Sequence, residues 1–211
     1  MITVVNYGLG NVLAIANIYH RLNIGVTLAE TAGELAVAER VILPGVGAFD
    51  WAMGQLEASG MRPTLDELVL KKKRPVLGIC VGMQMLAKQS EEGVLPGLGW
   101  IDGAVKRFPA ATGGGEIRLP HMGWNNVAPR NRESLFRGMD ADIRFYFLHS
   151  YYFAPSQDKD ILAETDYHGS YASSVRAGNI FGVQFHPEKS HQWGIQLLRN
   201  FAELDLCCGL E

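Results

Sequence analysis

The stretch "RPVLGICVGMQML", residues 74–86, places a cysteine between two glycines directly behind an apolar run. The apolar run predicts a buried strand, and a helix is expected to begin near Val81. Cys80 then lies on the sharp turn between strand and helix, so that residues 78–82, "GICVG", have the G-x-nucleophile-x-G form of a nucleophile elbow. Side chains in place of the two glycines would clash in so crowded a turn. A strand that ends in such an elbow favours an α/β fold.

A cysteine on this turn has two properties that a nucleophile needs. The N-terminus of a helix is the positive end of its dipole, which favours the reactive thiolate form of Cys80. The backbone amide of Val81 points toward the space that a developing oxyanion would occupy. A buried structural cysteine fits the same five residues equally well, so the elbow by itself does not decide between the two interpretations.

A candidate general base lies in "FGVQFHPEKS", residues 181–190. His186 directly follows an apolar strand, and Glu188 stands two residues further on. In an extended segment such residues face the same side, so the carboxylate can hold the imidazole ring and stabilise its protonated form. A histidine at a strand end would mean little alone. Together with the elbow it predicts a triad of Cys80, His186 and Glu188.

The loop "LPGVGAF", residues 43–49, follows another predicted parallel strand. Ligands of open α/β sheets bind beyond the carboxyl ends of the strands, where this loop and Cys80 both emerge. Gly45 and Gly47 allow a backbone amide to turn toward a negative oxygen, although an ordinary tight turn explains them equally well. "NYGLGN", residues 6–11, does not complete a dinucleotide-binding fingerprint, because Leu13 stands where the third glycine is required.

Outward from these motifs, strands and helices alternate in the first half of the chain, which predicts a mostly parallel sheet covered on both faces. The second half contains strand-like segments joined by turn residues, and we expect them to pair in mixed or antiparallel fashion on the edge of the same sheet. A glycine-rich loop is expected at 111–116. The segments of the first half are strands at 1–7, 26–30 and 40–45 and a helix at 11–23, with Gly25 after its end. Those of the second half are strands at 100–108, 143–153, 160–167, 170–178 and 179–185, then a helix at 191–204.

Composition excludes several classes of protein. The chain has 211 residues and a formal net charge of −3, so nucleic-acid binding is not expected, and we interpret the basic run at 71–74 as a solvated helix end. No apolar run approaches the roughly 18 residues of a membrane span. Three cysteines, Cys80, Cys207 and Cys208, form neither a disulfide framework nor a common zinc site. One domain over residues 1–211, in the cytoplasm and without metal or cofactor, is the expectation.

Taken together, "PGVGAF", "GICVGMQ" and "QFHPEKS" resemble the motifs of a class I glutamine amidotransferase, in the same order and over most of the chain. Within that class the likeness is greatest to the glutaminase subunits of imidazole glycerol phosphate synthases. "NYGLGN", "GLGWI", "PHMGWN" (residues 120–125) and "FYFLHSYY" (residues 145–152) support this narrower resemblance.

The resemblance implies a role for particular residues. Cys80 would attack the side-chain amide of glutamine to give a γ-glutamyl thioester, with His186 and Glu188 completing the triad. The oxyanion hole would be formed by the amides of Val81 and of Val46 or Gly47. The residues that hold the glutamine would be Gln84, His149, Ser150 and Tyr151.

The resemblance also implies a partner, a (βα)8-barrel cyclase subunit that receives the ammonia in a heterodimer and uses it in histidine biosynthesis. The residues that would face this barrel are Asn11, Met122, Trp124, Asn125 and Lys189. Two other enzymatic interpretations stay open: a paralogous glutaminase that serves a different synthase, and a free-standing cysteine hydrolase of γ-glutamyl conjugates. A non-catalytic binding module is disfavoured, because all three triad residues are present.

Overall fold

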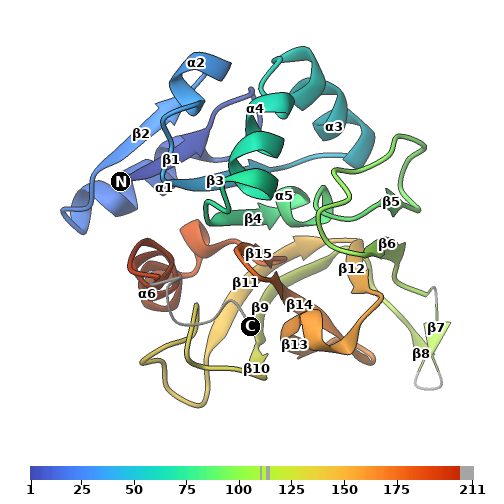
Figure 1. Cartoon of the computed structure of the whole chain (residues 1–211). Coiled ribbons are helices and arrows are strands. Elements are labelled where there is room, and N and C mark those ends of the chain that lie inside the picture. Colours follow the sequence, from blue (N-terminus) through green and yellow to red (C-terminus); the bar gives the residue numbers. More distant parts are fainter. Residues whose placement is uncertain (110, 113–114, 205–211) are drawn as a thin grey trace.

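The apolar run that precedes Cys80 forms the central strand β4, Val76–Cys80. The computed structural model describes residues 1–109, 111–112 and 115–204 (Figure 1). Strand β4 pairs in parallel with β3, Arg40–Gly45, on one side and with β15, Ile180–Val183, on the other. Every residue of β4 is buried, as expected for a strand that is covered on both faces of the sheet. The carboxyl ends of these three strands therefore lie side by side.

Eight strands make up the main sheet, in the order β10-β13-β14-β15-β4-β3-β1-β2. The half that contains β2, β1, β3, β4 and β15 is parallel, and the three strands beyond β15 pair in antiparallel fashion. The mostly parallel, mixed sheet predicted from the sequence is confirmed. The remaining strands of this sheet are β1 (Ile2–Val5), β2 (Val26–Ala29), β10 (Ala128–Pro129), β13 (Ile161–Asp166) and β14 (Ser170–Ala177).

Helices flank the sheet, and α1, Val12–Arg21, shows how they are attached. Its buried residues follow helical spacing, and the Tyr19 hydroxyl donates a hydrogen bond to the Leu198 carbonyl of α6 (3.0 Å). Asn23, with φ of 55°, follows the end of α1 in the left-handed conformation, two residues before the glycine that the sequence suggested. The other helices are α2 (Ala32–Leu35), α3 (Phe49–Ala58), α4 (Arg62–Asp66), α5 (Val81–Gln84) and α6 (His191–Ala202), with a π-helical turn η1 (Glu67–Lys71) and 3-10 turns η2 (Asp158–Asp160) and η3 (Pro187–Lys189).

Within the described residues three small sheets lie outside the main one, and two of them correct the expectation for the second half. Strand β9, His121–Asn126, pairs with β11, Arg144–His149. Strand β12, Tyr151–Pro155, pairs with β6 (Gly103–Arg107), which also pairs with β5 (Gln89–Ser90). The segment 143–153, expected as one strand, is therefore two strands that break at Ser150 and belong to different sheets. Alternation of apolar residues indicates a strand but not its partner.

Some expectations fall on residues that the structure does not describe. Cys207 and Cys208 lie outside the described residues, as do positions 113 and 114 of the predicted glycine-rich loop. On either side of those positions, β7 (Ala111–Thr112) and β8 (Gly115–Glu116) pair as a short antiparallel ladder. None of the helices within residues 1–109, 111–112 and 115–204 is both long and apolar enough to cross a membrane.

Candidate active site

Cys80 has a strained backbone at the end of β4. Its φ of 56° and ψ of −114° are rarely adopted by a residue with a side chain, and such conformations cost about 1–3 kcal/mol. Helix α5 starts at the next residue, as the sequence predicts, but it extends only over Val81–Gln84. The side chain of Cys80 is almost fully buried, with 4% of its surface exposed. A strained, buried cysteine on a strand-to-helix turn is the geometry that a nucleophile elbow requires.

The glycines on either side of Cys80 are required by space. A Cβ atom built on Gly82 would lie 1.9 Å from the Leu43 carbonyl oxygen of the neighbouring strand. A Cβ atom built on Gly78 would lie 2.6 Å from the Gly82 carbonyl oxygen. Both distances are too short for any side chain, so the crowding inferred from the sequence is confirmed.

His186 and Glu188 lie close together after β15. The Nδ1–H of His186 donates a hydrogen bond to Oε1 of Glu188 over 2.9 Å, and both side chains are buried. The connection is the 3-10 turn η3 instead of the extended segment assumed from the sequence. The turn is attached to strand β11, because the backbone N–H of His186 donates to the Tyr146 carbonyl (2.9 Å) and the backbone N–H of Tyr146 donates to the Ser190 hydroxyl oxygen (3.0 Å).

The surroundings of His186 favour its protonated form. Burial lowers the pKa of the ring, but its interactions with the Cys80 sulfur and the Glu188 carboxylate outweigh burial and raise that pKa to about 10. The ring therefore carries a proton at neutral pH when a thiolate stands beside it. When a carbon atom is bonded to the Cys80 sulfur, the ring can give this proton to a group that leaves that carbon.

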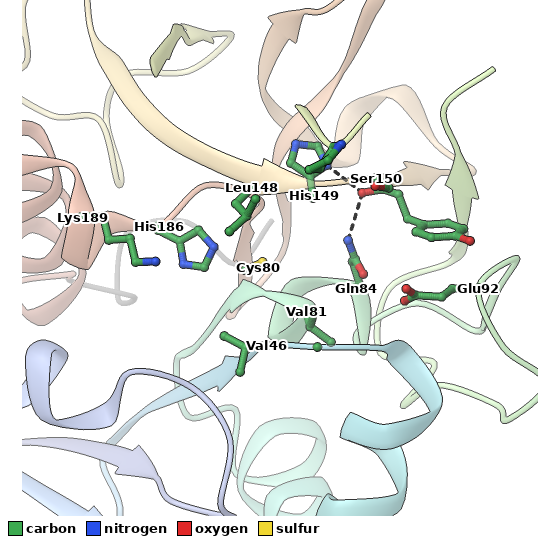
Figure 2. A pocket seen from close by; sticks show the side chains of 13 residues that line it. Val46, Cys80, Val81, Gln84, Glu92, Leu148, His149, Ser150, His186 and Lys189 are labelled. Atoms are coloured by element: carbon green, nitrogen blue, oxygen red, sulfur yellow. Dashed lines mark hydrogen bonds between the residues drawn. The ribbon is translucent and has the colours of Figure 1, made fainter. Parts of the chain in front are cut away.

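A cavity of about 310 Å³ opens beside the sulfur of Cys80 (Figure 2). Apart from Glu188, every residue that the sequence analysis assigned to the triad, the oxyanion hole or the substrate site lines this cavity. Val46 approaches it from the end of β3, on the side of Val81 (Figure 2), and Gly47, the next residue, also lines it. Gly47 has a φ of 84°, a conformation that favours glycine. The cavity thus collects residues from several segments that lie far apart in the sequence.

Gln84 and His149 meet at one backbone oxygen. The Tyr151 carbonyl accepts hydrogen bonds from Nε2 of Gln84 (3.0 Å) and from Nδ1–H of His149 (2.8 Å), drawn as dashed lines in Figure 2. Nε2 of His149 lies 3.2 Å from both Nδ1 of His121 and the Tyr171 hydroxyl. Both ring nitrogens of His149 thus have protein partners, and the ring acts by fixing the 150–151 backbone.

His121 and His149 form a buried pair that remains neutral. Burial lowers the pKa of His121 to about 4. The pKa of His149 is lowered to about 3, chiefly by burial and further by the neighbouring ring of His121. The hydrogen bond to the Tyr151 carbonyl acts in the opposite direction. His121 stacks on the ring of Tyr167, with ring centres 3.9 Å apart. The pair is a rigid support for the cavity wall.

Glu92 is a cavity residue that the sequence analysis did not identify. Its Oε2 atom accepts a hydrogen bond from the backbone N–H of Phe49 at the start of α3 (2.9 Å), and its side chain faces the space beside Gln84 (Figure 2). The carboxylate lies in a loop after the two-residue strand β5 and belongs to no local motif. Only the three-dimensional arrangement brings it to the cavity.

The residues predicted to face a partner do not all lie on one surface. Met122 and Trp124 are exposed on the same face of β9, and Trp124 stacks on the exposed ring of His191, with ring centres 5.3 Å apart. Asn125 points to the opposite face of the strand, where its amide is bonded to Nε2 of His121 (3.2 Å). Asn11 is exposed before α1, and Lys189 lines the cavity.

Comparisons with known proteins agree with this geometry. The family model "Glutamine amidotransferase class-I" matches residues 4–204. The chain is 55% identical over 204 residues to the imidazole glycerol phosphate synthase subunit HisH of Bdellovibrio bacteriovorus and 48% identical to the same-named subunit of Leptospira interrogans. Each alignment covers 97% of this chain and 100% of the relative. A crystal structure described as a glutamine amidotransferase superposes with a TM-score of 0.73 at 20% identity, covering 96% of this chain and 97% of the other, and this likeness concerns the fold alone.

Proposed function

The chain belongs to the class I glutamine amidotransferases, and on this premise we propose that it is the glutaminase subunit of an imidazole glycerol phosphate synthase. One observation carries the proposal: Cys80 lies on a strained elbow at the cavity, beside a histidine that is hydrogen-bonded to a buried glutamate. The two relatives described above carry that subunit's name and match over their full length.

In the first half of the reaction, the thiolate of Cys80 attacks the amide carbon of glutamine. The carbon–nitrogen bond of the tetrahedral intermediate breaks as His186 donates its proton to the departing nitrogen, which leaves as ammonia. In the second half, water attacks the γ-glutamyl thioester and gives a proton to His186. Breakage of the carbon–sulfur bond then releases glutamate and restores the thiolate. Glu188 holds the His186 ring in place throughout, in its protonated form and in the neutral form that receives the proton from water.

The oxyanion of each tetrahedral intermediate needs hydrogen-bond donors. The amide of Val81 is one proposed donor, and the amide of Val46 or Gly47 is the other, since all three residues line the cavity around the sulfur. Loss of one such donor costs about 3–4 kcal/mol in other enzymes. A change in the orientation of the Val46–Gly47 peptide would therefore switch the activity on or off.

Glutamine is the substrate that suits the remaining cavity walls. We assign its α-ammonium group to the carboxylate of Glu92 and its α-carboxylate to the backbone amides at Ser150 and Tyr151. Gln84 and His149 hold the carbonyl of Tyr151 and thereby fix the position of these amides. A cavity of about 310 Å³ is of a suitable size for a small amino acid.

The proposed partner is a (βα)8-barrel cyclase subunit in a cytoplasmic heterodimer. Ammonia that escaped into water at neutral pH would be protonated and would lose its nucleophilicity, so it has to pass directly into the partner. Met122 and Trp124 offer an exposed apolar surface next to the cavity mouth, of the kind that forms interface hot spots. Lys189 lies near this surface, since its Nζ stands over the ring of Tyr146, the residue that pairs with Trp124. Asn11, exposed before α1, is a further proposed contact. The amide of Asn125 would act indirectly, through its bond to His121.

The test is to measure glutamate release by the purified chain alone, with the cyclase subunit, and with the cyclase subunit bound to its ribonucleotide substrate. The proposal predicts a weak rate that rises by orders of magnitude only with the loaded cyclase and disappears in the Cys80→Ala variant. Equal rates with and without the cyclase would instead indicate a free-standing hydrolase. No release in any of these conditions would indicate a glutaminase that serves another synthase.

A further inference from the structure

Gln184 is a buried polar residue that the mechanism above does not use. It follows β15 directly, and none of its surface is exposed. Its backbone N–H donates to the Ser173 carbonyl (2.9 Å), and its side-chain Nε2 lies 3.9 Å from the sulfur of Cys80, within hydrogen-bonding range for a sulfur acceptor. A buried amide that contacts the reacting atom calls for a chemical explanation.

The direction of the hydrogen bonds around this amide can be derived from a backbone group. The Tyr151 carbonyl can only accept, so the Gln84 side chain must turn its NH₂ group toward it. The second hydrogen of that NH₂ group points to Oε1 of Gln184, over 3.0 Å. Because Gln184 accepts there, its own NH₂ group is the end that faces Cys80. The opposite orientation would set two NH₂ groups against each other.

The other groups that face Cys80 do not supply this contact. His186, backed by Glu188, approaches from η3 and is used for proton transfer. Tyr7, after β1, donates its hydroxyl proton to the Pro44 carbonyl (2.7 Å), and burial raises the pKa of that hydroxyl, so it stays neutral. Glu92 and Lys189 lie further out on the cavity wall. Gln184 is therefore a neutral donor to the sulfur, and its orientation is fixed by its neighbours.

We propose that Gln184 is a further catalytic residue, which donates an N–H to the Cys80 thiolate and is held in that orientation by Gln84 and the Tyr151 carbonyl. The inference rests on the proposed function, in which Cys80 is the nucleophile. A donor to the thiolate favours the ionised form before glutamine arrives, and it acts whether or not a partner is bound.

The test is the rate at which iodoacetamide alkylates Cys80, followed by mass spectrometry of the Cys80 peptide as a function of pH. Gln184→Met loses both the donor and the acceptor for Gln84 without adding a charge, and Gln184→Glu keeps the shape and the acceptor but loses the donor and adds a negative charge when ionised. We expect the midpoint of the rate–pH curve to move to higher pH in both variants, so that alkylation near pH 6 slows at least about tenfold while the limiting rate at high pH is largely retained.

Asn200→Asp is the matched control, since Asn200 is an equally buried amide that donates to the carbonyls of Leu135 and Arg137, away from the cavity. Its midpoint should equal that of the unmodified chain, and thermal unfolding shows which variants are folded. An unchanged midpoint in folded Gln184→Met overturns the inference alone, whatever the added charge does in Gln184→Glu. A Cys80 that in the unmodified chain reacts no faster than a thiol of the denatured chain near pH 6 overturns both the inference and the proposed function.

Discussion

Two glycines hold Cys80 in its strained conformation. Because Gly82 approaches the Leu43 carbonyl and Gly78 approaches the Gly82 carbonyl, the turn cannot relax without moving β3 or α5. The strain at Cys80 is thus maintained by close backbone packing on both sides, and its result is a sulfur at the cavity wall. The arrangement depends on the absence of two side chains as much as on the presence of a thiol.

We predict that Gly82→Ala lowers the free energy of unfolding by more than about 2 kcal/mol and abolishes glutamine hydrolysis, because its Cβ would lie 1.9 Å from a carbonyl oxygen. Gly54→Ala is the control. Gly54 lies within α3, and no atom stands within 4 Å of an added Cβ, so this change should raise the stability by about 0.5–1 kcal/mol. Urea unfolding measures the stability of both variants, and an assay of glutamate release measures hydrolysis. Unchanged stability in Gly82→Ala would contradict the close approach.

A second prediction at the residue scale concerns the proton on His186. Replacing Glu188 by glutamine removes a carboxylate that raises the pKa of the ring, so we expect that pKa to fall below its value of about 10. Proton delivery to the departing nitrogen should then be impaired, and glutamine hydrolysis should drop by about 10²–10⁴-fold. NMR titration of the ring and an assay of glutamate release measure the two effects. Glu203→Gln, at an exposed ion pair with Arg137, should change neither.

Among the elements, β9 and β11 support the cavity through the neutral His121–His149 pair. In the unfolded chain both rings take up a proton near pH 6.5, whereas the folded rings stay neutral down to about pH 4 and 3. The unfolded state therefore binds more protons across this window. Stability is complete above pH 6.5 and is lost as the pH falls toward the folded pKa values.

We predict a loss of up to about 1.4 kcal/mol per histidine for each pH unit between 6.5 and 4, beyond the loss due to other groups. His121→Gln removes one of the two titrating rings and should make the dependence shallower, even if the variant is less stable at pH 7. Urea unfolding at a series of pH values measures the slope. Equal slopes in the variant and the unmodified chain would show that the ring is not kept neutral by burial.

At the scale of elements, the parallel half of the sheet could be predicted from the sequence and the small sheets could not. Strands such as β3 and β4 are continuous apolar runs that alternate with helices, and this pattern has few alternatives. Strands β6, β9, β11 and β12 are only partly buried and pair outside the main sheet, β9 with β11 and β6 with β12, and β9 was not predicted as a strand from the sequence. Their partners depend on contacts between residues far apart in the chain, which periodicity does not encode.

The same distinction applies to the site. Cys80 and the pair His186–Glu188 stand in short linear motifs, so the sequence predicted residues that the fold brings to one cavity. Glu92 reaches the cavity from a loop that carries no signal of its own. Gln184 stands in the quoted motif "QFHPEKS", but only the structure shows that its amide contacts Cys80. The face on which Asn125 lies depends on the register of β9 and could not be predicted from its motif.

For the whole molecule, the exposed apolar surface beside the cavity is the predicted point of attachment. We expect Trp124→Ala to weaken binding of the proposed cyclase subunit at least about tenfold, because an exposed tryptophan stacked on His191 has the features of a hot spot. Isothermal titration calorimetry measures the affinity. Val37→Ala, at a more exposed apolar residue after α2, is the control, and equal affinities in the two variants would exclude Trp124 from the interface.

The central claim is that glutamine bound at Cys80 supplies its amide nitrogen directly to a partner. The most direct measurement uses glutamine whose amide carries a heavy nitrogen isotope, mixed with the cyclase subunit, its ribonucleotide and an excess of ordinary ammonium at neutral pH. The account predicts an imidazole product that carries the heavy isotope with the unmodified chain and only ordinary nitrogen with Cys80→Ala. A product that matches the surrounding ammonium in both cases would contradict it.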